Sequence, residues 1–384
     1  MKKALIITTI SGFVPQFEIQ NIRLLQNLGY EVHYASNFNR PVYEYDKTIF
    51  RENQIVTHHF TIEKSPVHIL KNCRALMELK KILKEQKFDL IHCHNPMGGV
   101  LGRIAAMRYA PNAVMIYTAH GFHFFKRGPW KNWFMYYPVE RMLAHVTDYL
   151  ITINSEDYER ALKFHLRKDG KVWKIPGAGL DLRRFFPESE VKSDIRRMLN
   201  FPENAFLLLS VGELNRNKNH SAVIRAIGLL QEKNIFYGIC GRGPYRKKLE
   251  KLIMKEGLTG HVRLLGYRND IEKVLQAADC FVFPSKREGF GMAAVEAMAA
   301  GKPLITSDCR GTREYMENHV TGIVCAENTP KSYANAIEQI KNSAALREKT
   351  GKACRKKALQ FGSEETRRVM RCVYEQASKK RGAK

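Results

Sequence analysis

Short apolar runs alternate with segments of helical periodicity along the whole chain. In the first half, the pattern predicts strands at 3–9, 31–35, 90–93, 114–118 and 149–153, and helices at 17–28 and 76–84. The second half restarts the pattern, with strands predicted at 206–211, 236–240, 262–265, 280–283 and 303–306 and a helix from about residue 221. Strands that alternate with helices form parallel sheets covered by helices on both faces. The restart therefore predicts an α/β protein with two such sheets, each in its own lobe.

A short glycine-rich segment from Pro176 to Asp181, followed by Pro187, separates the two halves and has the composition of a hinge. We expect a first Rossmann-like domain over residues 1–178 and a second over 179–362. A last helix at about 363–377 is expected to cross back, so that residues 363–384 complete the first domain. Ligands of open parallel sheets bind at the carboxyl ends of the strands, which predicts a ligand in a cleft between two facing lobes.

Composition narrows the classes of partner. The 384 residues are 44% hydrophobic and 26% charged, as is typical of a soluble globular protein, and the formal net charge is +25. Such a charge favours nucleic acid, an acidic membrane surface or a phosphate-rich substrate. The basic residues are spread along the chain without a recognised nucleic-acid-binding module, so nucleic acid is not the expected partner. No run of 18 apolar residues predicts a membrane-spanning helix, and eight scattered cysteines without a Cys-x-x-Cys pair are typical of reduced thiols in the cytoplasm.

Two carboxylates, Glu288 and Glu296, bracket a Gly-x-Gly turn that opens a helix. Gly289 and Gly291 allow backbone N–H groups to approach a ligand closely, and the helix N-terminus attracts anions. The carboxylates can accept hydrogen bonds from neutral hydroxyls on either side of that anion site. A phosphate flanked by polyols describes a sugar nucleotide. The alternative interpretation is a buried loop followed by a helix that carries one solvated glutamate.

Three other strand ends carry loops of the same character. After 206–211 comes a polar, basic loop in which Lys218 could neutralise a diphosphate and Arg216 could add planar hydrogen bonding. The tight turn Gly241-Arg242-Gly243-Pro244 follows the next strand, and Tyr267 follows the third, where it could receive a base. Each loop alone fits a solvated connection, but the four in this order are more specific together.

This order of motifs resembles the retaining glycosyltransferases of family four, which have the GT-B fold of two Rossmann-like lobes facing each other across a donor-binding cleft. The first half resembles a bacterial capsular or exopolysaccharide subgroup through the stretches 29–35, 117–124 and 136–140. The resemblance implies transfer of a sugar from a nucleotide sugar, expected to be a UDP-sugar, to a lipid-linked or saccharide acceptor in surface polysaccharide assembly. An alternative is a nucleotide-sugar epimerase on the same fold, which needs neither an acceptor nor a membrane-facing surface.

The resemblance also implies residue roles. Glu296 would bind the ribose hydroxyls, Glu288 the hydroxyls of the donor sugar and Lys218 the diphosphate, while His120 would lie near the donor sugar and the reaction centre. His120, Glu288 and Lys218 are the expected catalytic residues. Further donor contacts are expected from Gly12, Arg216, Gly243, Tyr267, Gly289, Phe290, Gly291 and Met292. One position departs from the family: Glu213 stands where a basic residue is common, and Arg216 is our hypothesis for its replacement.

Neither a metal nor another cofactor is expected. The chain has no Asp-x-Asp motif and no residue that stands out as a covalent nucleophile. The resemblance, by itself, implies same-face attack with the leaving phosphate as base. His92 and His94 share one face of a predicted strand and could ligate a metal, but no third ligand is visible at a nearby spacing. A strand end that lines the cleft is the favoured interpretation of this pair.

The segment 122–137 is rich in aromatic residues, with basic residues at 126, 127 and 131. Trp130, Trp133, Phe134 and Tyr137 fall on one face of a predicted helix. This combination suits a membrane interface, and it equally suits a helix packed on the first lobe. With a polyprenyl-diphosphate-linked sugar as the expected acceptor, we expect a cytoplasmic protein associated peripherally with the anionic inner face of the plasma membrane.

Overall fold

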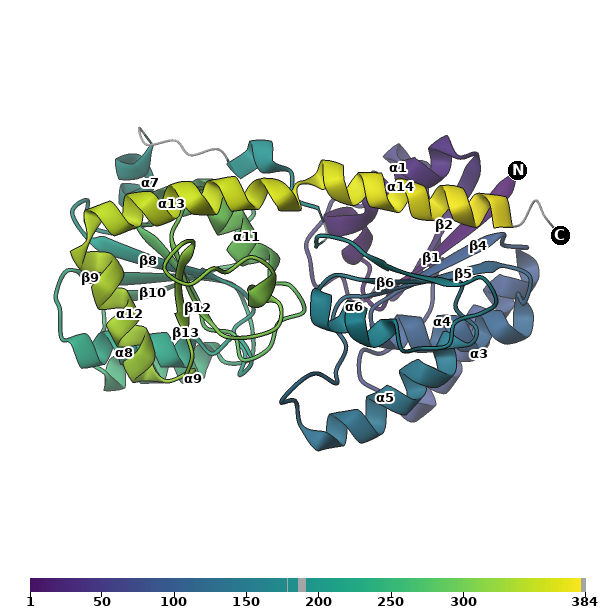
Figure 1. Cartoon of the computed structure of the whole chain (residues 1–384), viewed down its shortest axis with the longest axis horizontal. Coiled ribbons are helices and arrows are strands. Elements are labelled where there is room, and N and C mark those ends of the chain that lie inside the picture. Colours follow the sequence, from purple (N-terminus) through teal and green to yellow (C-terminus); the bar gives the residue numbers. More distant parts are fainter. Residues whose placement is uncertain (178, 186–190, 381–384) are drawn as a thin grey trace. The chain divides into compact units, whose positions relative to one another are not determined.

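The computed structural model describes residues 1–177, 179–185 and 191–380, which form two compact units (Figure 1). The first unit comprises Met1–Gly179 and Glu364–Lys384, and the second comprises Leu180–Ser363. Ala178, at the expected domain boundary, and Pro187 of the expected hinge lie outside the described residues.

The first unit contains a seven-stranded parallel sheet in the order β3-β2-β1-β4-β5-β6-β7. The five predicted strands are present within two residues of their expected ends. The two edge strands β3 and β7 were not predicted, because most of their side chains are partly or fully exposed and neither forms an apolar run. The strands are β1 (Lys2–Ile7), β2 (Tyr30–Ser36), β3 (Val56–His59), β4 (Leu90–His94), β5 (Val114–Ala119), β6 (Tyr149–Thr152) and β7 (Lys171–Lys174).

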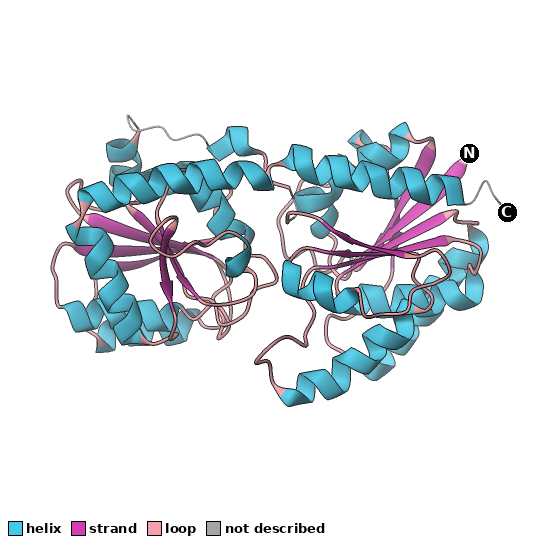
Figure 2. Ribbon diagram, in the orientation of Figure 1, coloured by secondary structure: helices cyan, strands magenta, loops and turns pink. Residues whose placement is uncertain are grey.

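Helices cover both faces of this sheet, with α1 and α14 on one face and α3, α4 and α5 on the other (Figures 1 and 2). A π-helix, η1 (Val14–Glu18), leads into α1. The C-terminal helix α14 is tied to the sheet by the Tyr374 hydroxyl, which lies 3.0 Å from Nδ1 of His92. The helices are α1 (Ile19–Asn27), α2 (Thr48–Glu52), α3 (Ile69–Glu85), α4 (Pro96–Tyr109), α5 (Trp130–Ala144), α6 (Ser155–Ala161) and α14 (Ser363–Lys380).

The second unit contains a six-stranded parallel sheet in the order β10-β9-β8-β11-β12-β13. The five predicted strands are present, and the edge strand β13 is additional. The strands are β8 (Phe206–Val211), β9 (Ile235–Cys240), β10 (Val262–Gly266), β11 (Cys280–Phe283), β12 (Leu304–Ser307) and β13 (Gly322–Cys325). The helices are α7 (Lys192–Met198), α8 (His220–Leu230), α9 (Arg246–Lys255), α10 (Ile271–Ala277), α11 (Met292–Ala299), α12 (Pro330–Asn342) and α13 (Ala344–Ala358).

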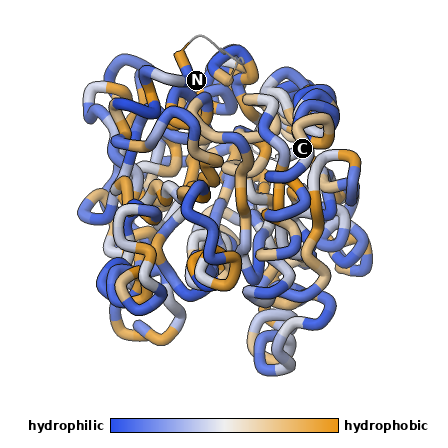
Figure 3. Tube along the Cα trace, turned by 90° about the vertical axis from the view of Figure 1, so that its left-hand side faces the viewer, coloured by the Kyte–Doolittle hydropathy of each residue, from blue (hydrophilic) through white to orange (hydrophobic). Residues whose placement is uncertain are grey.

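The strand order reverses between β1 and β4 in the first sheet and between β8 and β11 in the second. In open parallel sheets, ligands bind outside the carboxyl ends of the strands at such a switch point. Hydrophobic and hydrophilic residues alternate along the surface helices (Figure 3). Within the described ranges, no helix combines the length and the apolar character that crossing a bilayer requires.

Candidate active site

The loops that follow β8 and β11 in the second unit join at its switch point. The backbone N–H of Lys286 donates to the carbonyl of Asn217 at 2.8 Å, and the Asn217 side chain donates to the carbonyl of Arg287 at 2.9 Å. Beside these contacts, Nζ of Lys218 lies 2.6 Å from Oε1 of Glu288. The structure therefore brings together two predicted site residues that are 70 positions apart in the sequence.

The Lys218 side chain is held from several directions. Its ammonium lies 4.8 Å from the centre of the Phe283 ring, and its backbone N–H donates to Oδ1 of Asn215 at 2.9 Å. The side chains of Lys218 and Glu288 are only 20% and 12% exposed, so water screens their attraction weakly. The loop thus presents a positioned cation at the carboxyl end of the sheet.

Gly291, at the start of α11, occupies a position that only glycine fits. Its φ of 96° lies in the left-handed region, and a Cβ would lie 2.7 Å from the Phe283 ring and 2.8 Å from the Tyr315 hydroxyl. Phe290 is buried against Tyr315 and Phe361, at ring-centre distances of 5.7 and 5.4 Å. Phe290 is therefore available to a ligand only through its backbone, next to the N–H groups that open α11.

Glu296 lies on the second turn of α11 and is partly buried. Burial raises the pKa of Glu296 from its usual 4.5 to about 7, although the positive charge of Arg184 acts in the opposite direction. The carboxyl group is therefore close to its midpoint at neutral pH. It accepts hydrogen bonds on both oxygens only after it has lost the proton.

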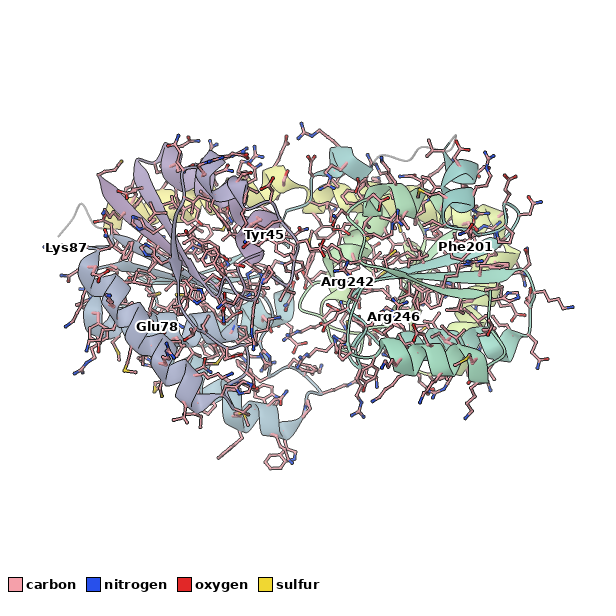
Figure 4. All side chains as sticks on the ribbon, turned by 180° about the vertical axis from the view of Figure 1, so that it is seen from behind. Tyr45, Glu78, Lys87, Phe201, Arg242 and Arg246 are labelled. Atoms are coloured by element: carbon pink, nitrogen blue, oxygen red, sulfur yellow. The ribbon has the colours of Figure 1, made fainter. Side chains whose placement is uncertain are left out.

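The turn after β9 packs against the loop that follows β8 and carries Lys218, called the lysine loop below. A Cβ on Gly243 would lie 2.4 Å from the carbonyl oxygen of Leu214, so the glycine permits this close approach. The guanidinium of Arg242, labelled in Figure 4, lies 5.2 Å from the centre of the Tyr267 ring. Arg216 is exposed on the same lysine loop, and Glu213 accepts a hydrogen bond from Asn215 at 2.9 Å.

Two arginines join this region without having been assigned a role from the sequence. In the sequence, Arg242 was considered only as a member of the turn Gly241-Arg242-Gly243-Pro244. Arg310, from the loop after β12, is 6% exposed, and its Nε donates to the backbone carbonyl of Glu288 at 3.3 Å. The motif order does not reveal Arg310, because its proximity to Glu288 depends on the pairing of β11 with β12.

In the first unit, Gly12 is required by the packing of the chain itself. A Cβ there would lie 2.6 Å from the carbonyl oxygen of Pro41 and 2.5 Å from that of Tyr43. Tyr45, also labelled in Figure 4, donates from its hydroxyl to Ser11 at 2.9 Å. The segment around residues 41–45 therefore folds over the loop that follows β1. This packing explains why a glycine stands at position 12, independently of the predicted approach of a diphosphate.

His120 directly follows β5, and its Nε2 lies 3.1 Å from Nδ1 of His94 at the end of β4. Oε1 of Glu18 lies 3.6 Å from the same His94 nitrogen. Burial lowers the pKa of His120 to about 4 and raises that of Glu18 to about 7. His120 is therefore neutral at physiological pH.

His92 and His94, the histidine pair considered as metal ligands, have different hydrogen-bond partners in the structure. Both ring nitrogens of His92 are bonded within the first unit, to the Tyr374 hydroxyl at 3.0 Å and to Thr118 Oγ1 at 2.8 Å. Within the described part of the chain, the side chains whose potential ligand atoms all lie within 4.8 Å of one another are instead those of Glu18, His94 and His120. Sequence spacing could not show this group, because its members come from three separate segments.

A mainly apolar pocket of about 610 Å³ lies within the first unit. Glu140, in its wall, binds Arg103 at 2.6 Å and accepts a hydrogen bond from the Tyr117 hydroxyl at 3.1 Å. Eight of its 18 lining residues come from the stretches 117–124 and 136–140 that carry the subgroup resemblance. The lining residues are Thr9, Ile10, Lys64, Ser65, Pro66, Asn95, Pro96, Met97, Val100, Tyr117, Gly121, Phe122, His123, Phe124, Met135, Tyr136, Val139 and Glu140.

The aromatic residues of α5 do not form a single exposed face. Trp133 and Tyr137 pack on the buried Phe124 ring at 5.6 and 5.3 Å, as the packed-helix interpretation expects. Trp130 and Phe134 are 72% and 81% exposed. The helix thus anchors to the first unit through one aromatic pair and presents the other to its surroundings.

Comparison with known proteins gives concordant results over nearly the whole chain. Residues 191–357 match the family described as glycosyl transferases group 1, and residues 4–154 match the glycosyl transferase 4-like family. The putative glycosyltransferase EpsD of Bacillus subtilis is 36% identical over 377 residues, which cover 97% of this chain and 96% of the relative. An Escherichia coli UDP-Gal:alpha-D-GlcNAc-diphosphoundecaprenol alpha-1,3-galactosyltransferase is 30% identical over 343 residues, which cover 88% and 86%.

Among solved structures, Anabaena HepE in complex with UDP-glucose superposes with a TM-score of 0.78 at 19% identity, covering 98% of this chain and 100% of HepE. At this identity the likeness shows the fold. It agrees with two Rossmann-like units built on parallel sheets of seven and six strands. The chain therefore belongs to the group 1 glycosyltransferases and has their two-lobed GT-B fold.

Proposed function

We propose that this glycosyltransferase is a retaining enzyme that transfers a sugar from a UDP-sugar to a lipid-diphosphate-linked sugar in surface polysaccharide assembly. The observation that carries the proposal is the Lys218–Glu288 pair, 2.6 Å apart beside the N-terminus of α11. A cation, outward-facing amides and a carboxylate then lie together, as a diphosphate attached to a polyol requires. HepE, a structural neighbour, was crystallised with UDP-glucose, and the E. coli relative is named for a diphosphoundecaprenol-linked acceptor.

In this proposal the second unit binds the donor. Lys218 and the amides of 289–292 hold the diphosphate, and Glu288 accepts hydrogen bonds from the sugar hydroxyls while it orients Lys218. Glu296 binds the ribose hydroxyls. Tyr267, beneath the Arg242 guanidinium, offers a flat surface for the base.

The chemistry follows from the charge that develops during transfer. The bond between the anomeric carbon and the diphosphate oxygen breaks, and its electron pair stays on UDP. Lys218 and the amides of α11 stabilise this growing negative charge. The acceptor hydroxyl forms the new bond on the same face and passes its proton to the leaving phosphate. We propose that His120, neutral because of its burial, serves as the first unit's contact to the donor sugar, and that no metal takes part.

We assign the acceptor to the pocket of the first unit. Its apolar walls suit the less polar faces of a sugar, and Lys64 in its lining can attract a diphosphate. Residues 65–66 and α5 both form part of the pocket wall. Exposed apolar side chains lie next to each of these segments in the chain: Val67, Ile69, Leu70, Trp130 and Phe134. This arrangement favours a transferase over an epimerase, which needs no second substrate, and it favours peripheral association with the cytoplasmic membrane face.

A panel of UDP-, GDP- and dTDP-sugars tests the proposal. We expect at least one UDP-sugar to raise the melting temperature, because ligand at 100 times its Kd stabilises a protein by about 2.7 kcal/mol. The stabilising donor is then incubated with an N-acetylglucosaminyl-diphospho-lipid, and the product linkage is read by NMR. An α-linked product from an α-linked donor supports retention, whereas a β-linked product refutes it. Conversion of the donor sugar without acceptor would identify an epimerase.

A further inference from the structure

A row of three side chains runs through the first unit and ends at His120. Glu18 closes the π-helix before α1, His94 ends β4, and His120 follows β5. Nδ1 of His94 lies 3.6 Å from Oε1 of Glu18 and 3.1 Å from Nε2 of His120. Glu18 and His94 are almost completely buried, while His120 is partly exposed. π-Helical turns occur frequently at functional sites, where they reposition a side chain.

The hydrogen-bonding pattern determines which nitrogen of each ring carries the proton. Nε2 of His94 is buried and has no hydrogen-bond partner among the residues that the structure describes. A buried N–H without an acceptor loses its hydrogen bond to water without compensation, and unpaired acceptors are tolerated more often than unpaired donors. The proton of His94 therefore lies on Nδ1, which donates to Nε2 of His120. Because His120 accepts on Nε2, its own proton lies on Nδ1.

Glu18 reinforces this arrangement. Its Oε2 accepts a hydrogen bond from Asn21 at 2.6 Å, which directs the carboxyl group, and its Oε1 faces the protonated nitrogen of His94. When Glu18 is ionised, its negative charge favours a proton on that nitrogen.

Neighbouring rings pack against the buried His94 and against His120. Phe13 packs edge-on against His120, with ring centres 5.0 Å apart, and lies 5.4 Å from His94. His92 packs on the other side of His94 at 4.1 Å and is itself fixed by Tyr374 and Thr118. Hydrogen bonds in such a buried environment are electrostatically stronger than in water.

The same three side chains have the composition of a metal site. A metal-bound imidazole almost always donates its second N–H to an outer acceptor, which Nε2 of His94 lacks among the described residues. The distance of 3.1 Å between the two ring nitrogens is also that of a hydrogen bond. The geometry therefore favours a shared proton over a shared metal ion.

We propose that Glu18 and His94 are positioning residues that hold His120 with its proton on Nδ1, so that His120 acts as a neutral hydrogen-bond donor to a hydroxyl or phosphate oxygen of the bound substrate. The substrate part of this inference rests on the proposed function. The tautomer itself does not, and it can be measured without substrate.

The first experiment is NMR of the ligand-free enzyme labelled with ¹⁵N in its histidine rings. The His120→Gln variant assigns the His120 signals. We expect His120 to be protonated on Nδ1 and unprotonated on Nε2, and a His94→Leu variant to mix the two forms. A proton on Nε2 of His120 in the wild type, or stoichiometric zinc on the purified protein that is lost with the ring of His94, overturns the inference. This result decides the tautomer even if no sugar transfer is ever detected.

The second experiment compares two substitutions of His94 under steady-state conditions. Asparagine places an amide N–H close to the position of imidazole Nδ1, whereas leucine keeps volume without a donor. We expect His94→Leu to lower kcat about tenfold, near the upper worth of one hydrogen bond, and His94→Asn to stay within about threefold of the wild type. The donor KM should change less than twofold in both.

Glu18→Gln, which keeps the shape but removes the charge, should lower kcat in the same direction as His94→Leu and leave KM unchanged. His58→Gln, a histidine change on the edge strand β3, is the control for altered stability of the first unit. Equal losses of kcat in His94→Leu and His94→Asn would contradict the positioning role while leaving the glycosyltransferase proposal intact.

Discussion

At the scale of single residues, the largely buried Lys218–Glu288 pair places a cation that is already held in position before any ligand binds. Glu288 holds the lysine in place without ligand, at 2.6 Å, and Phe283 packs beneath the ammonium. A cation that is already positioned needs no reorganisation when charge develops on the leaving diphosphate. Lys218 should therefore matter more for the transition state than for binding of the ground state.

Replacing Lys218 with alanine tests this residue. We expect kcat to fall about 10- to 100-fold, because a hydrogen bond from a charged group is worth about 1.5–3 kcal/mol, and the donor KM to change less. Steady-state kinetics with the donor identified by the panel provide the measurement. Lys286→Ala is the matched control, since Lys286 is exposed two residues before Glu288. A change confined to KM would mean that Lys218 contributes uniform binding only.

Glu296 gives a prediction for pH. Burial raises the pKa of its carboxyl group to about 7, and in the role proposed for Glu296 only the ionised form would accept hydrogen bonds from both ribose hydroxyls. Affinity for UDP-glucose, whose diphosphate has no proton to lose in this range, should rise up to about tenfold per pH unit below 7 and level off above it. Calorimetric titration between pH 5.5 and 8.5 measures this slope.

The Glu296→Gln variant should bind UDP-glucose weakly and with little dependence on pH. An equally steep slope in this variant would assign the titration to another group. The free energy of unfolding depends on pH in the opposite direction to the affinity. Because the folded-state pKa of Glu296 lies above the usual 4.5, burying the ionised carboxylate lowers the free energy of unfolding as the pH rises from 4.5 to 7.

At the scale of elements, α5 performs two tasks with alternate aromatic residues. Trp133 and Tyr137 fasten the helix to the core of the first unit, and Trp130 and Phe134 remain exposed on the helix that contributes to the pocket proposed for the acceptor. Basic side chains at 126, 127 and 131 accompany the exposed pair. Such a surface gains energy both from apolar insertion and from attraction to anionic lipids.

Binding to lipid vesicles tests this element. We expect the wild type to sediment with phosphatidylglycerol vesicles at low salt and to be released by salt. The double variant Trp130→Ser with Phe134→Ser should lose at least tenfold in affinity, since burying each ring is worth about 1.5–3 kcal/mol. The control is Leu229→Ser with Met254→Ser, which removes two exposed apolar side chains from the second unit. Absence of binding at low salt, or equal loss in the control, would contradict the membrane assignment.

At the scale of the whole molecule, the loops at the two sheets' switch points gather the polar groups assigned to the reaction. In the second unit these are a cation and backbone amides, and no Asp-x-Asp motif accompanies them. A lysine and a helix N-terminus can neutralise a leaving diphosphate in place of a metal ion.

We therefore expect transfer to continue within about twofold of its original rate after dialysis against EDTA. The comparison is made between dialysed enzyme and the same sample with added Mg²⁺ or Mn²⁺. Loss of activity in EDTA that returns with one of these ions would refute a metal-independent reaction.

Much of the fold was predictable because buried central strands must be apolar throughout. Strands such as β8 and β11 therefore appear as runs in the sequence. The edge strands β3 and β7 were missed because their side chains are partly or fully exposed, whereas β13 was missed although three of its four residues are buried. The start of α3 was also missed, since Ile69 and Leu70 are exposed there and break the expected periodicity.

The sequence by itself determined the family, the two α/β units and the strand-end loops, because glycines, apolar runs and charged loops are local signals. Only the tertiary structure decided which side chains meet. It paired Lys218 with Glu288 and placed Arg310 beside them, and it joined His120 to His94 and Glu18, which the sequence had not linked. The physical reason is that parallel strands bring their carboxyl ends to one edge in an order set by the sheet, whereas the chain order does not contain that arrangement.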